Sequence, residues 1–190
     1  MKYCTLIPGP LGEILLRAEG DALTGVFFVG QKYFPTADAS ADCYSIADAP
    51  RVLRETQQQL DEYFAGEREH FTLRLRPAGT AFQRSVWDQL VKIPFGEIDS
   101  YGRIAQRLGL AAGSARAVGA ANGRNPLSIV VPCHRVVSSA GDLTGYAGGL
   151  HRKEALLALE RPHSMLPRQM ELLTSNDAHA ALRPSRHRPR

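Results

Sequence analysis

Short apolar runs separated by turn signals make up the first 30 residues. The runs cover residues 3–7, 13–19 and 22–29, and Pro8-Gly-Pro-Leu-Gly12 and Gly20-Asp21 lie between them. Proline and glycine at such places are typical of tight turns. The pattern therefore predicts an antiparallel meander of three strands.

The following segments predict a loop, a helix and a further strand. Residues 35–50 are small, polar and acidic, which is typical of a loop. Between residues 52 and 64 mostly apolar residues recur at helical spacing and form one face, and Gly66 ends the pattern. The positions of this face are Leu53, Thr56, Leu60, Tyr63 and Phe64. Apolar and polar residues alternate over residues 71–75, which predicts a half-buried strand.

Helical patterns dominate the second half of the chain. Thr80, followed three residues later by Gln83, is the signature of a capping box at the start of a helix. We expect its apolar face to consist of Phe82, Val86, Trp87, Leu90 and Val91. Ser100 precedes a short helix that Gly109 ends, and a third helix is expected over residues 114–121. Two short helices joined by a glycine-containing turn are a candidate helix-turn-helix.

The remaining pattern completes the predicted domains. Residues 122–135 run from a turn into a strand-like apolar segment, and a last helix carrying three leucines stops before Pro162. We expect an α+β fold, with a small N-terminal antiparallel sheet domain that includes a helix, followed by a mainly helical domain with the helix-turn-helix. The predicted limits are 1–77 for the first domain and 78–162 for the second. Residues 163–190 form a basic tail that we expect to be mostly disordered.

Charge and composition narrow the class of protein. The 190 residues carry a net charge of +4, with an acidic first domain and the largest excess of arginine in the tail. This weakly favours a polyanionic partner. No apolar run approaches the ~18 residues of a membrane span, and the N-terminus lacks a secretory pattern. Three widely spaced cysteines argue against a disulfide scaffold and a cysteine-rich zinc site, so we expect a cytoplasmic protein and no metal.

Cys133 is the first candidate for chemistry. It lies between Pro132 and His134, with Arg135 next along the chain. A thiol becomes a strong nucleophile as the thiolate, which basic neighbours favour. The alternative interpretation is a buried structural cysteine.

The segment from Ser114 to Asn122 is almost free of bulky side chains, apart from Arg116. A helix with such a small face could enter the narrow minor groove of DNA. Tight packing between helices would also explain it. Tyr101, Asn125, Tyr146 and Glu160 have no distinctive pattern when each is considered alone.

Five sequence blocks together are specific. They read SYGRIA at 100–105, ARAVGAAN at 115–122, NPLSIVVPCHRVV at 125–137, LTGYAGG at 143–149 and KEALLALE at 153–160. In this order and spacing the chain strongly resembles the O6-alkylguanine-DNA alkyltransferases, also called methylated-DNA–protein-cysteine methyltransferases. The resemblance is strong over residues 80–160 and holds only in outline before residue 77.

The resemblance implies a single-use repair reaction on a base that has been flipped out of double-stranded DNA. Cys133 would accept the alkyl group from O6 of guanine, irreversibly. His134 and Glu160 would form, through a water, the relay that takes the thiol proton. Tyr101 would push the base out of the helix, and its hydroxyl would interact with guanine N3. Arg116 would fill the gap that the extruded base leaves in the base stack.

The resemblance also implies a set of contact residues. The residues that would contact DNA in the minor groove are Tyr101, Arg116, Ala117, Ala121 and Asn122. Those that would form or brace the base pocket are Asn125, Val136, Tyr146 and Ala147, together with the Cys133 carbonyl. No cofactor is implied, and we expect a monomer that does not bind a membrane.

Three other functions stay open at this point. A protein that binds lesions without chemistry is one, although family relatives of that kind carry Trp at the acceptor position. A thiol hydrolase using Cys133 and His134 is another, but adjacent residues on a strand point to opposite faces. A transcription regulator would follow from the helix-turn-helix alone.

Two features of the chain depart from the family. Ala155 stands where many relatives have a Trp. The tail is extra, and it is more simply interpreted as a dispensable solvated end than as a phosphate anchor.

Overall fold

A computed structural model describes residues 1–161, and the structural statements below concern this part of the chain. The predicted tail therefore lies outside the described residues. Within them, no helix is long and apolar enough to cross a membrane.

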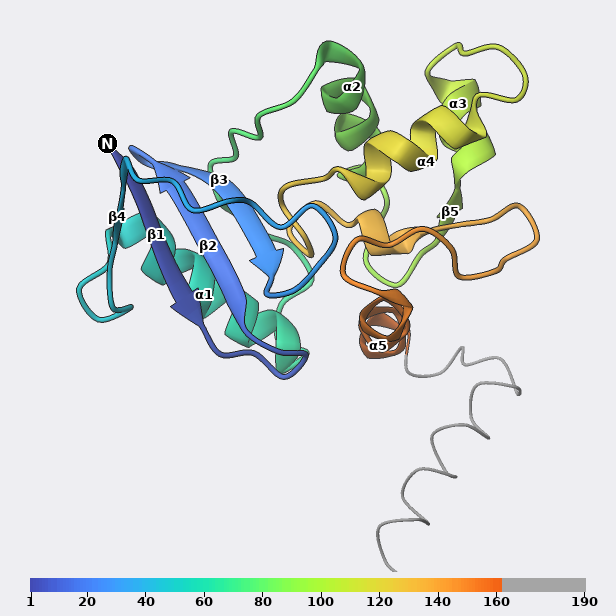
Figure 1. The fold of residues 1–190 in the computed structure, drawn as a ribbon. Helices are drawn as coiled ribbons and strands as arrows, with labels where there is room; N and C mark the ends of the chain where they lie inside the picture. The colour runs from blue at the N-terminus through green and yellow to red at the C-terminus, as the bar shows by residue number, and fades with distance from the viewer. Residues whose placement is uncertain (162–190) are drawn as a thin grey trace, which may run out of the picture. The chain divides into compact units, whose positions relative to one another are not determined.

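The N-terminal sheet has the predicted meander and one unpredicted strand (Figure 1). Strands β1 (Lys2–Ile7), β2 (Ile14–Glu19) and β3 (Ala22–Phe28) pair antiparallel in succession, as the sequence predicts. A short strand β4 (Ala41–Cys43) pairs parallel with β1, which gives the order β3-β2-β1-β4. The sheet is therefore mixed, and part of the expected loop over residues 35–50 belongs to it.

The added strand brings two cysteines together. In the β1–β4 register Cys4 lies opposite Cys43, and a disulfide joins them with their Cα atoms 4.5 Å apart. The expectation that the cysteines form no disulfide framework was wrong for this pair. The two residues are 39 apart in sequence, and their proximity depends on a strand of three residues in a polar segment that has no strand pattern.

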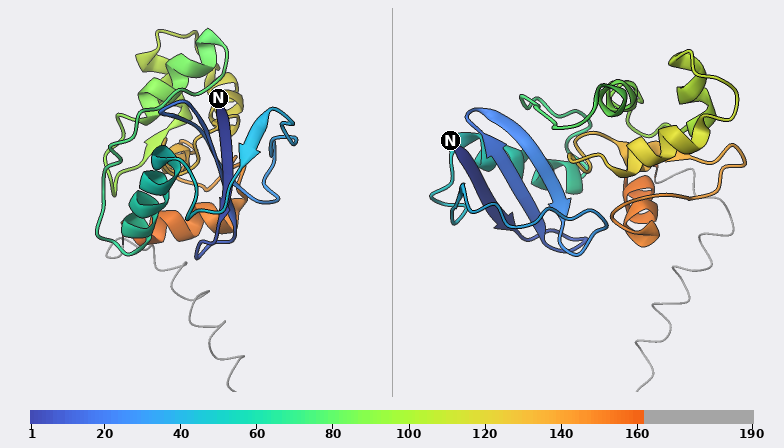
Figure 2. Two further views of the ribbon diagram at one scale, coloured as in Figure 1. Left: turned by 90° about the vertical axis from the view of Figure 1, so that its left-hand side faces the viewer. Right: turned by 45° about the horizontal axis from the view of Figure 1, so that its top comes forward.

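Helix α1 (Arg51–Phe64) packs on one face of this sheet, as the views in Figure 2 show. The strand expected over residues 71–75 is absent. An isolated bridge forms instead, in which Leu23 N donates to Arg74 O at 2.8 Å and Arg76 N donates to Leu23 O at 2.8 Å. The alternating pattern identified a half-buried segment correctly but overestimated its pairing with β3.

The helices of the second half begin close to the predicted positions. Helix α2 (Ala81–Leu90) starts with the complete Thr80–Gln83 capping box. Helix α3 (Tyr101–Arg107) is capped by the Ser100 hydroxyl, which accepts a hydrogen bond from Arg103 N. The remaining helices are α4 (Ala115–Gly123) and α5 (Leu150–Glu160). The predicted apolar face of α2 is partly wrong. Phe82 is 37% exposed, and Val91, which follows the end of the helix, is 56% exposed.

The segment before α5 differs most from its prediction. Residues 122–135 were expected to lead into a strand, but Cys133–Arg135 form a turn of 3-10 helix, η1. Val136–Val137 (β6) follow as a short strand and pair parallel with Asp99–Ser100 (β5), and Leu127 forms an isolated bridge with Val26. A 3-10 turn spreads successive side chains around an axis. The strand argument against a Cys–His pair therefore does not apply.

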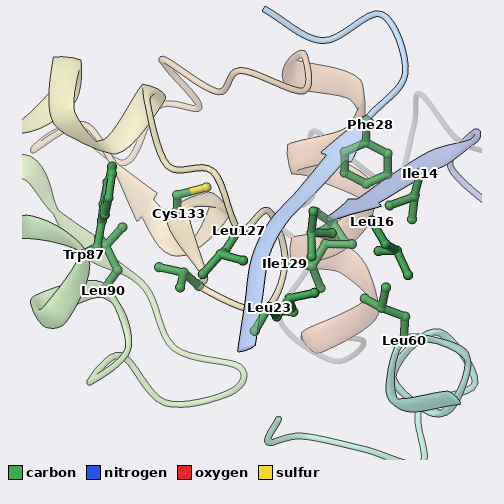
Figure 3. Packing of buried hydrophobic residues seen from close by; sticks show 14 of the residues in the cluster. Ile14, Leu16, Leu23, Phe28, Leu60, Trp87, Leu90, Leu127, Ile129 and Cys133 are labelled. Carbon is green, nitrogen blue, oxygen red and sulfur yellow. The ribbon is translucent and has the colours of Figure 1, made fainter. Parts of the chain in front are cut away.

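A continuous set of buried apolar side chains links the two halves. In Figure 3, Cys133 and Leu127 lie between Trp87 of α2 and the residues of the sheet. Backbone hydrogen bonds join the same regions, since Val26 N of β3 donates to Pro126 O and Ser128 N donates to Val26 O. The segment that precedes Cys133 is thus held against the sheet.

Candidate active site

Cys133 is the first residue of η1 and is 3% exposed. The Asn125 side chain donates to its sulfur at 3.1 Å and to Val131 O at 2.8 Å, and its oxygen accepts from Leu127 N. Asn125 therefore ties together the backbone on both sides of the turn and the thiol itself. Burial raises the pKa of the thiol to about 11, although the Asn125 hydrogen bond and the Lys153 charge oppose this rise. At neutral pH the group is a thiol and needs a base.

The next side chain, His134, is fully buried against a carboxylate. His134 Nε2 lies 2.8 Å from Glu160 Oε1. Arg135 donates to both oxygens of the same carboxylate, from Nε at 2.8 Å and from an Nη at 3.0 Å, and Tyr63 donates its hydroxyl at 2.8 Å. Burial alone would raise the pKa of Glu160, but the His134 and Arg135 hydrogen bonds lower it to about 2. Glu160 is ionised at neutral pH.

This ionisation determines the tautomer of His134. An ionised carboxylate only accepts hydrogen bonds, so Nε2 must carry the proton that faces Glu160. Burial lowers the pKa of His134, although Glu160 opposes this shift, and the ring is neutral. Its buried Nδ1 makes no hydrogen bond to another group among residues 1–161, which leaves a free lone pair on that nitrogen. The neutral ring can therefore act as a base through Nδ1.

Tyr101 lies at the start of α3 beside the loop that precedes α5. Its hydroxyl donates to Thr144 O at 3.0 Å, and burial raises its pKa. Gly145 has φ +59°, and a Cβ there would lie 3.2 Å from the Tyr101 hydroxyl. A Cβ on Gly148 would lie 2.6 Å from the ring of Tyr146. Glycine at these two positions allows the loop to approach both tyrosines.

Lys153 fixes the other side of this loop. Its side chain is fully buried, and Nζ donates to Val136 O at 2.5 Å and to Thr144 O at 2.6 Å. Burial lowers its pKa to about 8. The ammonium group ties the strand after η1 to the loop that carries Tyr146.

The small-faced helix α4 divides the predicted DNA contacts into two groups. Arg116 and Ala117 are exposed. Ala121 and Asn122 are 3% and 1% exposed, and Asn122 donates to Cys133 O at 3.3 Å. These two side chains face the interior of this structure, and their contact with DNA stays a prediction. Asn122 helps Asn125 to fix the turn at Cys133.

The residues predicted to form the base pocket follow Cys133 in the chain, in β6 and in the loop before α5. Val136 and Tyr146 are buried, and burial raises the pKa of the Tyr146 hydroxyl. Ala147 is partly exposed, and its carbonyl accepts from Lys32 N at 2.9 Å. Among residues 1–161 no group of three or more His, Cys, Asp or Glu side chains could hold a metal ion.

Comparison with known proteins tests the resemblance directly. Residues 2–77 match the ribonuclease-like domain of 6-O-methylguanine DNA methyltransferase, and residues 81–162 match the DNA binding domain of the same protein. The chain belongs to the methylated-DNA–protein-cysteine methyltransferase family. It is therefore a DNA repair enzyme that transfers an alkyl group to a cysteine.

Individual relatives extend the match over most of the chain. The methyltransferase of Mycolicibacterium paratuberculosis is 48% identical over 164 residues, which are 86% of this chain and 94% of the relative. That of Methanosarcina acetivorans is 46% identical over 83% of this chain and 97% of the relative. The crystal structure of Mycobacterium tuberculosis OGT in complex with DNA superposes with a TM-score of 0.75 at 42% identity, covering 84% of this chain and 93% of that one.

Three residues of this methyltransferase site were missed from the sequence. Arg135 was noted only as a basic neighbour, Lys153 only as part of a block, and Tyr63 only as a helix face position. For Arg135 a signal existed, since this charged residue stands within a largely apolar segment. Lys153 lies in the charged run His151-Arg152-Lys153-Glu154, so its local sequence carries no such signal. For Tyr63 the local sequence carries no signal, because its partner Glu160 is 97 residues away.

Proposed function

We propose that Cys133 is the alkyl acceptor and that O6-alkylguanine in double-stranded DNA is the substrate. The sulfur attacks the alkyl carbon, a carbon–sulfur bond forms, and the bond between that carbon and guanine O6 breaks. The electron pair of the broken bond stays on the guanine. The products are S-alkylcysteine and guanine, and each chain reacts once because nothing removes the alkyl group.

The observation that carries this proposal is the arrangement of Cys133, His134 and Glu160. The thiol proton passes to Nδ1 of His134, through a water, while the ionised Glu160 stabilises the imidazolium that forms. Tyr101 gives a proton to the departing guanine at N3, so the negative charge does not accumulate on the leaving group. Tyr101 then regains a proton through solvent, and overall one proton moves from the thiol to guanine.

On the DNA side, we propose that α4 enters the minor groove and that the target base is flipped. A methyl group on O6 lies within the base pair, out of reach of a buried thiol, so extrusion is needed. Support comes from the exposure of Arg116 and Ala117 and from the position of Tyr101, whose ring lies 3.7 Å from a Cβ placed on Gly119 of α4. Arg116 would fill the space that the extruded base leaves.

The pocket for the flipped base would be formed by Val136, Tyr146 and Ala147. The Cys133 and Val136 carbonyls would accept from the guanine amino group, and the Ala147 amide would donate to O6. Each carbonyl already accepts one hydrogen bond in this structure and has a second lone pair available.

We further propose that residues 78–162 form the DNA-binding and acceptor domain and residues 1–77 a supporting domain. We propose that the protein acts as a monomer. Its location would be the cytoplasm, because the substrate is cellular DNA.

Intact-mass spectrometry tests the reaction and its acceptor together. The protein is mixed with duplex DNA that contains one O6-methylguanine. We expect a gain of one methylene per chain, mapping to Cys133 and saturating at one. Tight binding without any mass gain would show a lesion-binding protein instead, and repeated turnover on esters or peptides would show a hydrolase.

A further inference from the structure

A tyrosine of the N-terminal half lies in hydrogen-bonding contact with the proton relay. Tyr63 stands near the end of α1, and its side chain is fully buried. Its hydroxyl donates to Glu160 Oε1 at 2.8 Å, the same oxygen that lies 2.8 Å from His134 Nε2. We infer that Tyr63 is a positioning residue for alkyl transfer, which holds Glu160 and limits how strongly this carboxylate stabilises a protonated His134. This inference rests on the proposed role of His134 as the base.

The packing around Tyr63 fixes the direction of its hydroxyl. The ring contacts Phe64, Phe71 and Phe95, with centroids 5.5, 5.6 and 6.3 Å away. A tyrosine held on several sides by aromatic rings loses little further freedom when its hydroxyl makes a hydrogen bond. The hydroxyl is therefore preorganised toward Glu160, and a phenylalanine could fill the same space.

The charges around the carboxylate determine what this hydrogen bond does. Glu160 faces His134 and Arg135 from η1 and Tyr63 from α1, and Gly96 N makes a long contact of 3.4 Å with its other oxygen. His134 is also influenced by the Lys153 ammonium of α5. Each donor to a carboxylate draws negative charge away from the others. Removing the Tyr63 hydroxyl therefore leaves more of this charge to attract the imidazolium form of His134.

The burial of the tyrosine shows that it acts as a donor and not as a proton acceptor. Burial and the nearby Glu160 charge raise the pKa of Tyr63 well above its usual range. Its hydroxyl stays protonated over the working pH range. Tyr63 therefore shapes the relay by orientation and hydrogen bonding and does not exchange its proton with substrate.

The Tyr63→Phe variant tests this role, with Tyr44→Phe as its matched control. Tyr44 lies in the same half of the chain, and its ring contacts Tyr3. Both variants and the wild type are assayed for single-turnover transfer from duplex O6-methylguanine DNA between pH 5 and 9, and thermal unfolding confirms that each is folded. We expect Tyr63→Phe to slow transfer roughly tenfold at neutral pH, because Glu160 loses the hydroxyl that holds it and therefore orients His134 less well. Tyr44→Phe should match the wild type.

The pH profile separates positioning from a merely structural role. Protonated His134 cannot accept the thiol proton, so the rate falls on the acid side of the profile. Because the variant favours imidazolium, this acid limb should shift to higher pH, by roughly half a unit to one unit. A Tyr63→Phe variant with the wild-type rate and the wild-type acid limb would overturn the inference. If the wild type itself transfers no methyl group, the proposed function fails first.

A measurement on the wild-type chain covers the case in which the variant does not fold. A buried hydroxyl proton in a hydrogen bond to a carboxylate should exchange slowly and give a resolved proton NMR signal. Because Tyr63 and His134 share one oxygen, that signal should show a through-space contact with the Nε2 proton of His134. The absence of this contact between the Tyr63 hydroxyl proton and the Nε2 proton of His134 would also overturn the inference.

Discussion

The disulfide between Cys4 and Cys43 fastens the edge strand β4 to β1, and its contribution to stability can be worked out from the chain. The two cysteines are 39 residues apart. In the chain-entropy treatment, closing a loop of this length in the unfolded state contributes about 4 kcal/mol at 25 °C. A change of 1 kcal/mol moves the unfolding midpoint of a 150–250-residue protein by roughly 2–4 °C. Opening the bond should therefore lower the midpoint by roughly 8–16 °C.

Thermal unfolding followed by circular dichroism measures this change in four samples. The wild type and Cys43→Ser are each unfolded with and without a reducing agent. We expect reduction to lower the midpoint of the wild type and to leave that of Cys43→Ser unchanged. Counting free thiols in the unfolded, unreduced wild type should give one, which is Cys133.

Two results would refute this reasoning. Three free thiols in the unreduced wild type would show that the strand pairing brings the cysteines together without joining them. An unchanged midpoint after complete reduction would show that β4 stays on β1 without the bond. Alkyl transfer should survive reduction, because the bond lies at the edge of the sheet and the acceptor lies in η1.

Four further predictions concern the site. Cys133→Ala should abolish methyl transfer and keep DNA binding in a mobility-shift assay, and any residual transfer would point to another acceptor. Arg116→Ala should slow repair of duplex DNA far more than reaction with free O6-methylguanine, whereas equal losses would argue against its role in the stack. Arg135→Met should lower the free energy of unfolding in urea by about 3–5 kcal/mol, because it leaves a buried carboxylate without its cationic partner, and a change below about 1 kcal/mol would contradict this. Finally, the pKa of Glu160 falls from 4.5 to about 2 on folding, so its contribution to the free energy of unfolding should be complete above pH 4.5 and lost as the pH falls toward 2. Glu160→Gln should weaken this acid dependence of the free energy of unfolding. An unchanged dependence would refute the assignment.

The periodic parts of the fold were predictable because their signals are local. The three strands of the meander, the amphipathic face of α1 and the Thr80–Gln83 capping box each follow from residues within one turn or one strand. The strand β4 was not predictable in this way. Its three residues lie in a polar segment, and the pairing with β1, together with the disulfide, holds them extended.

In the site, too, local sequence signals do not predict what depends on long-range contacts. The blocks around Cys133 indicate the proposed acceptor and its proposed relay, but an apolar run before a cysteine does not distinguish a strand from a 3-10 turn. The burial of Asn122 could not be inferred either, since a small helix face can be turned toward DNA or toward the thiol's own segment. Tyr63 and Glu160 meet only when the two halves of the chain pack together.

Glu160 is the last residue of α5, and this has a consequence for how the enzyme comes into being during synthesis. The proposed acceptor thiol and its imidazole are synthesised before the carboxylate that orients the imidazole, since His134 and Glu160 are 26 residues apart. Until α5 is complete, no charge holds His134 in its base-competent tautomer. On the proposed mechanism, the thiol therefore gains its base only after α5 has been made.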